Sequence, residues 1–373
     1  MKKCIFLLPA IIFLTGCWDQ HMLSQTKLIT AGGIDYTEDG KVVTTVSVPQ
    51  AFLGDSGRGT VINQVFSGEG QTARQSRLRL DRKVSEQLDA TKNQVLVLGE
   101  EVAKNDIYPI LDVFYRDPKS ALNAKMVVSI GSASEVINSK YTEPIKTIGI
   151  GEYLKEIITS AERDAVIPTD NLQTICPVMF DPGQDFVLPL FEPLEKTVRV
   201  AGLAFFHKSK MVGTIKEPLS VSYILLTGEK PMKELSTTER ISSKHENNVW
   251  NFISVKVKRN KRDFTVKVTP SGKISAHIKL KTNVVVTEYP LDNLDSPAEI
   301  KKLENQLSKI FTKNTQEVID KIQEMNSDTF GVGRKLMAFH YPTWEKLNWS
   351  KDYQKVDFSS SVDVQIDGNG IIE

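Results

Sequence analysis

Residues 253–257 read ISVKV, residues 264–268 read FTVKV and residues 274–280 read ISAHIKL. In all three runs apolar and polar side chains alternate. Successive side chains of a strand point to opposite faces of its sheet, so each run places its apolar side chains on one face. Strands with one apolar and one polar face are typical of antiparallel sheets that are exposed to water on one side. The second half of the chain is therefore predicted to contain such a sheet.

A long amphipathic helix is predicted to cover the apolar face of this sheet. Residues 296–299, SPAE, read as a capping box with proline at the first helical position. Apolar residues then recur at steps of three, four or seven up to about Met325, as in a helix that packs one face on a core. Residues 356–366 alternate again and are predicted to form a last strand. We expect residues 196–373 to be a C-terminal domain, an antiparallel sheet packed against a long helix.

The first half of the chain alternates between strand and helix signals. Residues 28–36 and 42–48 read as the two strands of a hairpin. Residues 95–98, VLVL, form a continuous apolar run, the pattern of a strand covered on both faces. Residues 133–138 are predicted to be a short helix. We therefore expect a mixed α/β N-terminal domain over residues 28–139.

Four further expectations concern segments with weaker patterns. Residues 54–72 are rich in Gly, Ser and Thr and are predicted to be a loop, and residues 73–88 a helix with Leu78 on its apolar side. The middle segment, residues 140–195, is dense in proline after one helix, which favours an irregular crossover or a small domain. Residues 221–226 are apolar and are predicted to be a strand. The expected fold class is α+β, with three domains.

Bulk composition excludes one class of partner. The chain has 373 residues, with 47 Lys and Arg against 46 Asp and Glu, and 40% hydrophobic residues. This composition is ordinary for a folded protein that is long enough for two or three domains. The balance of charge argues against a broad nucleic-acid-binding surface, so no nucleic acid is expected as a partner.

The first residues read as a lipoprotein signal. A basic start and an apolar run of roughly ten residues, too short to span a bilayer, precede Leu14-Thr15-Gly16-Cys17. We expect residues 1–16 to be cleaved as a signal peptide, with Leu14, Thr15 and Gly16 as the lipobox. Cys17 would carry S-diacylglycerol and an N-acyl group, and residues 17–27 would be a tether. The alternatives are a leader cut by ordinary signal peptidase, or a chance cysteine.

Catalytic and metal-binding motifs are weak. Residues 54–57, GDSG, resemble the loop around a serine nucleophile, but the only earlier histidine is His21, near the predicted anchor, and the rest of a protease pattern is missing. No two histidines have the spacing of a zinc-binding helix. Cys176 is expected to be a small buried apolar residue, with a catalytic thiol as the minor alternative. We expect no catalytic residue, no metal and no cofactor.

Three aromatic residues cluster near the end of the chain, Tyr341, Trp344 and Trp349, after the glycines of residues 328–334, DTFGVGR. Two interpretations remain open. The rings form a corner packed against the sheet, which is the favoured interpretation. Alternatively they form a contact patch for a membrane partner.

Five passages of the chain, taken together, resemble the Ger(x)C family, the lipoprotein C subunits of nutrient germinant receptors of endospore-forming bacteria. The resemblance runs in order through nearly the whole chain. The passages are Leu14 to Asp19, Gly33-Ile34-Asp35, Leu98 to Ala103 with Phe114 to Asp117, Ala201 to Phe206 with Met211 to Gly213, and Asp328 to Gly333 with Trp344 and Trp349. The chain departs from the family pattern at Met22-Leu23 and at Gly32, where an acidic-Leu pair and Ile are more usual.

The resemblance implies a three-domain α+β protein that is lipid-anchored at the outer face of the cell membrane, here the spore inner membrane. It implies assembly with two integral membrane subunits, A and B, into a receptor for small nutrients, without catalysis. A different class also fits the length and the anchor, a solute-binding lipoprotein of a membrane importer. That class requires two similar α/β lobes around a cleft.

Overall fold

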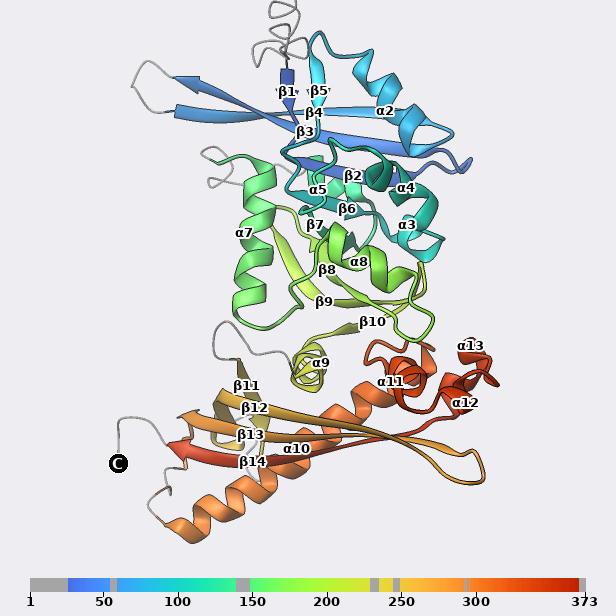
Figure 1. Ribbon diagram of the computed structural model, residues 1–373. Helices are drawn as coiled ribbons and strands as arrows, with labels where there is room; N and C mark the ends of the chain where they lie inside the picture. Colours follow the sequence, from blue (N-terminus) through green and yellow to red (C-terminus); the bar gives the residue numbers. More distant parts are fainter. Residues whose placement is uncertain are drawn as a thin grey trace, which may run out of the picture.

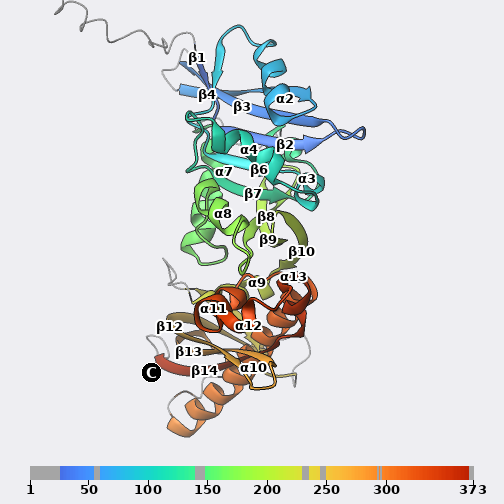
Figure 2. The same ribbon diagram turned by 45° about the vertical axis from the view of Figure 1, so that its right-hand side comes forward.

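The computed structural model describes residues 26–53, 59–138, 148–228, 235–243, 249–291, 294 and 296–368. Cys17, the lipobox and Ser56 lie outside the described residues. Two large sheets follow one another along an elongated molecule, with a short helix, α9 (Leu219–Thr227), between them (Figures 1 and 2). Within the described ranges, no helix is both long and apolar enough to span a membrane.

The first sheet has eight strands in the order β10-β9-β8-β7-β6-β2-β3-β4. Its centre, β2-β6-β7-β8, is parallel, and the pairs toward both edges are antiparallel. The strands are β2 (Ala31–Tyr36), β3 (Val42–Leu53), β4 (Gly59–Gly70), β6 (Val95–Leu98), β7 (Lys125–Ser129), β8 (Val187–Pro193), β9 (Val198–His207) and β10 (Lys210–Lys216). A separate parallel pair joins β1 (Thr26–Leu28) to β5 (Gln87–Asp89).

Helices cover both faces of this first sheet. On β6, Val95 and Val97 lie in one apolar cluster and Leu96 and Leu98 in another. The first cluster includes residues of α5 (Ala133–Asn138) and α7 (Ile150–Arg163). The second includes residues of α3 (Glu100–Lys104), α4 (Tyr108–Arg116) and α8 (Leu172–Met179). The prediction of a strand at 95–98 that is covered on both faces is confirmed.

The predicted loop at residues 54–72 is wrong over residues 59–70, which form β4 and pair with β3 along its length. Its glycines serve packing, because a Cβ on Gly68 would lie 2.4 Å from the backbone oxygen of Ser76 in helix α2 (Ala73–Asp81). The helix predicted over 73–88 is also wrong in its second half, since α2 ends at Asp81. Leu78, predicted on the apolar side, is 48% exposed.

The proline-dense middle segment is more regular than predicted. It holds α7, α8 and β8, and Pro189 lies inside β8. Strand β8 pairs with β7 only at Leu190 and Phe191, so at Pro189 it has a neighbour on one side alone, where proline is tolerated. The eight-stranded sheet takes strands from all three predicted domains, and it therefore crosses the boundaries predicted at 139/140 and 195/196.

The second sheet has four strands in the order β11-β12-β13-β14, which are β11 (Ser236–Arg240), β12 (Phe252–Val268), β13 (Ile274–Glu288) and β14 (Asp357–Gly368). The two runs at 253–257 and 264–268 form one strand, β12, with an irregular register near Val257. The predicted helix is α10 (Pro297–Glu324), about 42 Å long at 1.5 Å per residue. The α+β fold, with a C-terminal sheet on a long helix, is confirmed.

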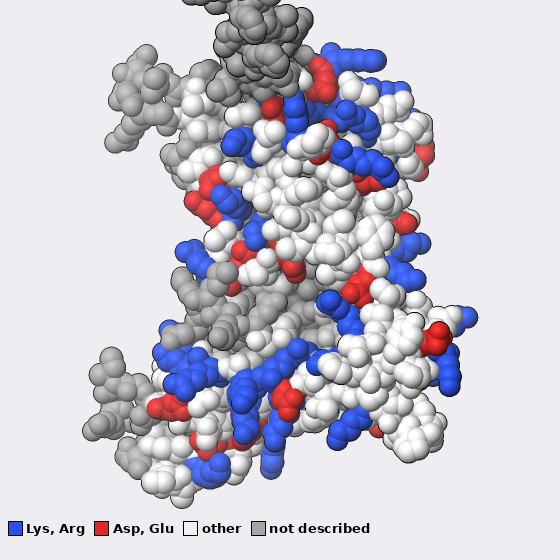
Figure 3. Space-filling view, viewed as in Figure 1, with Lys and Arg blue, Asp and Glu red and all other residues white. Residues whose placement is uncertain are grey.

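One strand corrects the expectation of a wholly antiparallel sheet. The last strand, β14, runs parallel to β13, because α10 carries the chain back along the sheet as a crossover connection. The face of the sheet away from the core carries the polar positions of the alternation. On it, β12 and β13 expose Lys258, Arg259, Lys261, Lys279 and Lys281, and Figure 3 shows Lys and Arg side chains gathered over the lower half of the view.

Side chains of α10 bind the outer edge of β14. Four of them, each four residues after the last, accept hydrogen bonds of 2.9 to 3.0 Å from alternate backbone N–H groups of the strand. The pairs are Glu304 with Ile366, Ser308 with Val364, Thr312 with Val362, and Gln316 with Ser360. A helix thus occupies the place of a fifth strand at this edge.

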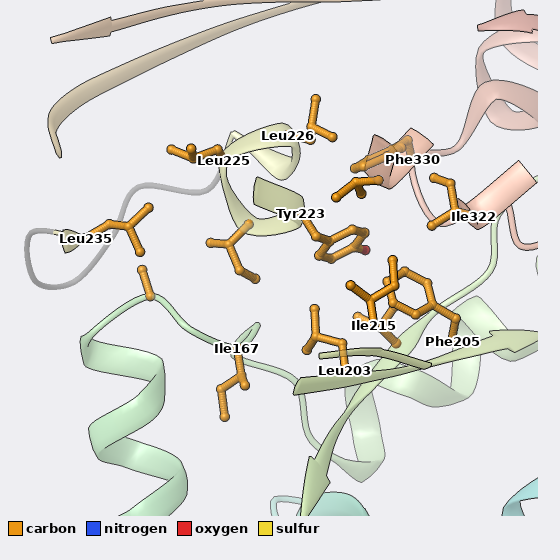
Figure 4. Packing of buried hydrophobic residues seen from close by; sticks show 14 of the residues in the cluster. Ile167, Leu203, Phe205, Ile215, Tyr223, Leu225, Leu226, Leu235, Ile322 and Phe330 are labelled. Carbon is orange, nitrogen blue, oxygen red and sulfur yellow. The ribbon is translucent and has the colours of Figure 1, made fainter. Parts of the chain in front are cut away.

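Helix α9 (Leu219–Thr227) joins the two sheets, and the strand predicted at residues 221–226 is wrong. Leu225, Leu226 and Tyr223 are all buried, and Figure 4 shows the Tyr223 ring beside Ile215 and Phe205 of the first sheet and Ile322 and Phe330 of the second half, with Leu225 and Leu226 on the opposite side of α9. A helix that is covered on every side is apolar on every side. A short apolar run does not distinguish such a helix from a buried strand.

Candidate functional site

The motif at residues 328–334 lies at a polar contact between the two halves of the molecule, which we call the joint. The joint is made by the loop before β8 and the segment after α10. Asp185 lies in the first half of the molecule and Asp328 in the second. The Asp185 carboxylate accepts hydrogen bonds from the backbone N–H of Asp328 at 2.8 Å and of Lys208 at 2.7 Å. The Asp185 backbone N–H donates to the Asp328 carbonyl oxygen at 2.9 Å. The two segments are therefore bonded in both directions.

The Asp328 carboxylate is the centre of the second-half segment. It accepts from the backbone N–H groups of Val332 and Gly333, at 2.9 and 2.8 Å, and from Nε1 of Trp349 at 3.1 Å. Burial, and to a smaller extent the Asp185 charge, raise the pKa of Asp328, these hydrogen bonds oppose the rise, and the resulting pKa is about 7. The joint therefore contains a carboxyl group that titrates near neutral pH.

Two glycines let the halves approach at this point. A Cβ on Gly333 would lie 2.6 Å from Nε1 of Trp349 and 2.7 Å from the Cα of Gly183. A Cβ on Gly183 would lie 2.6 Å from the backbone nitrogen of Arg334. Gly331 has a φ of 73°, which favours glycine, at the start of α11 (Val332–Phe339). In the DTFGVGR motif, close packing therefore requires glycine at position 333, and the backbone conformation favours glycine at position 331.

The three predicted aromatic residues do not form one surface patch. Trp349, in α13 (Trp349–Asp352), is only 9% exposed and packs on Trp344 and on Tyr353, with ring centroids 5.5 and 5.6 Å apart. Trp344 is half-buried at the end of α12 (Tyr341–Trp344). Tyr341 is 57% exposed, and next to this helix Phe339, which the sequence analysis did not single out, is 71% exposed. A partner contact through Tyr341, Trp344 and Trp349 stays a prediction.

His207 adds a further tie across the joint, which the sequence analysis missed. Its Nδ1 lies 3.1 Å from Oδ2 of Asp185, and its Nε2 lies 3.2 Å from Oγ of Ser350. The order Ser–His–Asp is that of hydrolase triads, but such a site also needs a substrate cavity beside the serine and donors for an oxyanion. Three cavities in the described part of the chain, of about 250, 470 and 660 Å³, are not lined by Ser350. We interpret the trio as a structural tie between β9 and α13.

The cavity of about 250 Å³ lies between the halves and is lined in part by Arg262, Thr329 and Asp170. The Arg262 guanidinium lies over the rings of Phe264 and Phe330, 4.7 and 5.8 Å from their centroids. Burial lowers the pKa of Arg262 and raises that of Asp170. These charged groups had no motif in the sequence, because residues from α8, β12 and the closing segment meet only in the folded chain.

Comparisons with known proteins agree with this architecture. The family described as "Spore germination protein N-terminal domain" matches residues 19–193, and "Spore germination B3/ GerAC like, C-terminal" matches residues 201–370. The chain is similar to the "Spore germination protein GerQC" of Bacillus cereus, at 24% identity over 100% of both chains. It is also similar to the "Spore germination protein KC" of Bacillus subtilis, at 24% identity over 95% of this chain and 92% of that one.

One solved structure has the same fold. The "Crystal Structure of the GerBC protein" matches with a TM-score of 0.55 and 18% identity, covering 90% of this chain and 96% of that chain. The two family matches meet between residues 193 and 201, at the start of β9. The N-terminal and C-terminal family models match in this order along the chain, and together they cover almost all of it. The chain therefore belongs to the Ger(x)C family of spore germination proteins.

Proposed function

We propose that the chain is a non-catalytic, lipid-anchored subunit of a germinant receptor, and that it acts in the response of spores to nutrients through contacts with integral membrane A and B subunits. The observation that carries the proposal is the similarity to a spore germination protein over the full length of both chains. The proposed location is the outer face of the cell membrane, the inner membrane of the spore.

The proposed anchor gives the mechanism its physical basis. Acyl chains on Cys17 hold the body of the protein within a few nanometres of the membrane. Confinement raises its effective concentration near membrane partners without any new contact. Loss of Lys2 and Lys3 with the leader leaves 45 basic against 46 acidic side chains, so charge gives no second anchor.

Substitution of the anchor cysteine tests the proposal. We expect Cys17→Ala to leave the fold intact by circular dichroism, to move the protein from the membrane fraction to the supernatant, and to impair nutrient-induced germination of spores. Cys176→Ala, which changes the other cysteine of the mature chain, is the control and should behave as the parent. Normal germination with a Cys17→Ala protein that is wholly released from the membrane would contradict the proposal.

Two observations favour this function over its alternatives. The two halves are built differently, an eight-stranded mixed sheet and a four-stranded sheet on one long helix, whereas an importer's solute-binding lipoprotein needs two similar lobes. The Ser350–His207–Asp185 trio is tied into the joint, and of its members only Asp185 lines one of the cavities described, while Ser350 lines none. Labelling of Ser350 by a fluorophosphonate would contradict the non-catalytic part of the proposal.

A further inference from the structure

The first half contains a cavity of about 470 Å³ between the sheet and helices α2 and α4. In Figure 1 these helices lie at the end of the molecule that carries β3 and β4. Protein interiors are close-packed and hold few voids larger than a water molecule. Pockets for small molecules measure roughly 300 to 1,000 Å³. The lining is largely apolar and includes Ile29, Ile34, Val46, Leu88, Leu96 and Phe114.

The floor of the cavity is open at Gly32 of β2. A Cβ on Gly32 would lie 3.8 Å from Cδ1 of Leu96 and 3.9 Å from Nδ2 of Asn93, which are ordinary contact distances. Packing therefore does not require glycine here. At the next position it does, because a Cβ on Gly33 would lie 3.1 Å from the Cβ of Ala133. A larger side chain at Gly32 would enter the cavity, so glycine at this position leaves it empty.

One buried acceptor borders the same space. Asn93 lines the cavity and is 7% exposed, and its Oδ1 has no hydrogen-bond partner in the described part of the chain. This oxygen would lie 4.0 Å from a Cβ on Gly32. An unpaired buried acceptor destabilises the fold, so native proteins seldom keep one without a partner. A ligand with an N–H or O–H group would supply that partner.

One exposed apolar side chain and two ion pairs lie at the edge of the cavity. Leu78 of α2 lines it and is 48% exposed. Arg74 pairs with Asp117 and Arg77 with Asp81, each at 3.2 Å. Because these charges already have partners, this edge favours an uncharged ligand over an ion.

We propose that this cavity binds a small, uncharged molecule with an apolar body and one hydrogen-bond donor, which places its donor on Oδ1 of Asn93 and its body over Gly32. This activity goes beyond the proposed function, which uses contacts between proteins alone. It can fail without affecting the anchor or the receptor assignment, because neither rests on residues of the cavity.

Indole and 1-methylindole are a matched pair of probes, since both are uncharged rings and only indole has an N–H donor. The purified full chain is titrated with each probe by calorimetry. We expect indole to bind one-to-one and 1-methylindole to bind at least about tenfold more weakly, which corresponds to 1.4 kcal/mol. Asn93→Ala should weaken indole to the level of 1-methylindole and leave 1-methylindole unchanged. Equal binding of both probes to the parent would overturn the role of Asn93.

Substitutions that place a larger side chain in the cavity test whether the probes bind there. Gly32→Ile should abolish the binding of both probes. The matched control is Gly368→Ile in β14, where a Cβ would lie 3.8 Å from Val285 and far from the cavity; it should bind indole as the parent does. Leu78→Trp, at an exposed position of α2, should also weaken binding and keeps the test valid if Gly32→Ile does not fold. Parent-like binding in folded Gly32→Ile or in Leu78→Trp, or no binding of indole to the parent, would overturn the proposal.

Discussion

Neighbouring residues of β7 in the first sheet, Val127 and Val128, are both fully buried and belong to different apolar clusters, one on each face. In β13 of the second sheet, Ile278 is fully buried and its neighbour Lys279 is exposed. The first sheet is covered by helices on both faces and the second on one. Alternation in the sequence therefore indicates a sheet face that is exposed to water, and its absence does not argue against a strand.

The largest expected effect tests this comparison with one type of substitution. Val127→Ala, Val128→Ala and Val284→Ala each remove two buried methyl groups and should each lower the free energy of unfolding by roughly 2 to 3 kcal/mol. Val285→Ala, on the polar face of β13, should stay within about 0.5 kcal/mol. Urea unfolding measures all four. An equal cost at Val284 and Val285 would mean that the second sheet is covered on both faces in solution.

The joint should make the stability of the molecule fall with rising pH. The pKa of Asp328 is raised from 3.8 to about 7 by burial, so between these values the folded state holds more protons than the unfolded state. Its contribution is therefore fully present below pH 4 and is lost as pH rises through 7. From pH 5 to 7 the loss should be about 2 kcal/mol.

Urea unfolding at a series of pH values measures this effect. Asp328→Asn should flatten the profile by the same amount. Asp357→Asn, an exposed position of β14, is the control and should keep the slope of the parent. Parallel profiles for the parent and Asp328→Asn would show that the carboxyl group keeps an ordinary pKa. Two separate transitions would show that the joint does not make the halves unfold together.

The smallest expected effect compares a helix that covers each sheet. Asn171 caps α8 over the first sheet, accepting from the backbone N–H of Thr174 at 3.0 Å, while the Thr174 hydroxyl accepts from the Asn171 N–H at 2.9 Å. Ser296, at the start of α10, makes no such bond. Asn171→Ala should cost about 1 kcal/mol and Ser296→Ala less than about 0.5 kcal/mol, read from unfolding midpoints. A larger loss of stability for Ser296→Ala would indicate that Ser296 caps α10 in solution, as the sequence predicts.

Much of the second half could be predicted from its sequence, because its signals are local. The alternation at 253–280 and the apolar stripe along α10 each indicate which residues face water and which face the core. The direction of β14 could not be predicted, since it depends on where a 28-residue helix delivers the chain. In the first half, β4 was missed because Gly68 and Gly70 have the composition of a loop and serve instead to admit α2.

The candidate site was predicted only in part. The motif at residues 328–334 was singled out for its glycines, and these do lie at the joint. The role of the Asp328 carboxylate depends on Trp349 and Asp185, 21 and 143 residues away, and spacing along the chain does not indicate such partners. Gly32 was noted as a departure from the family pattern, but the cavity above it exists only once α2 and α4 are in place.

The row of α10 side chains along β14 limits how copies of this protein can associate. An open strand edge is a template on which another chain can pair and polymerise. Glu304, Ser308, Thr312 and Gln316 already occupy the outward N–H groups of β14. A strand from a second molecule would first have to displace the whole helix. A high local concentration of the protein would therefore not lead to fibres that grow from this edge.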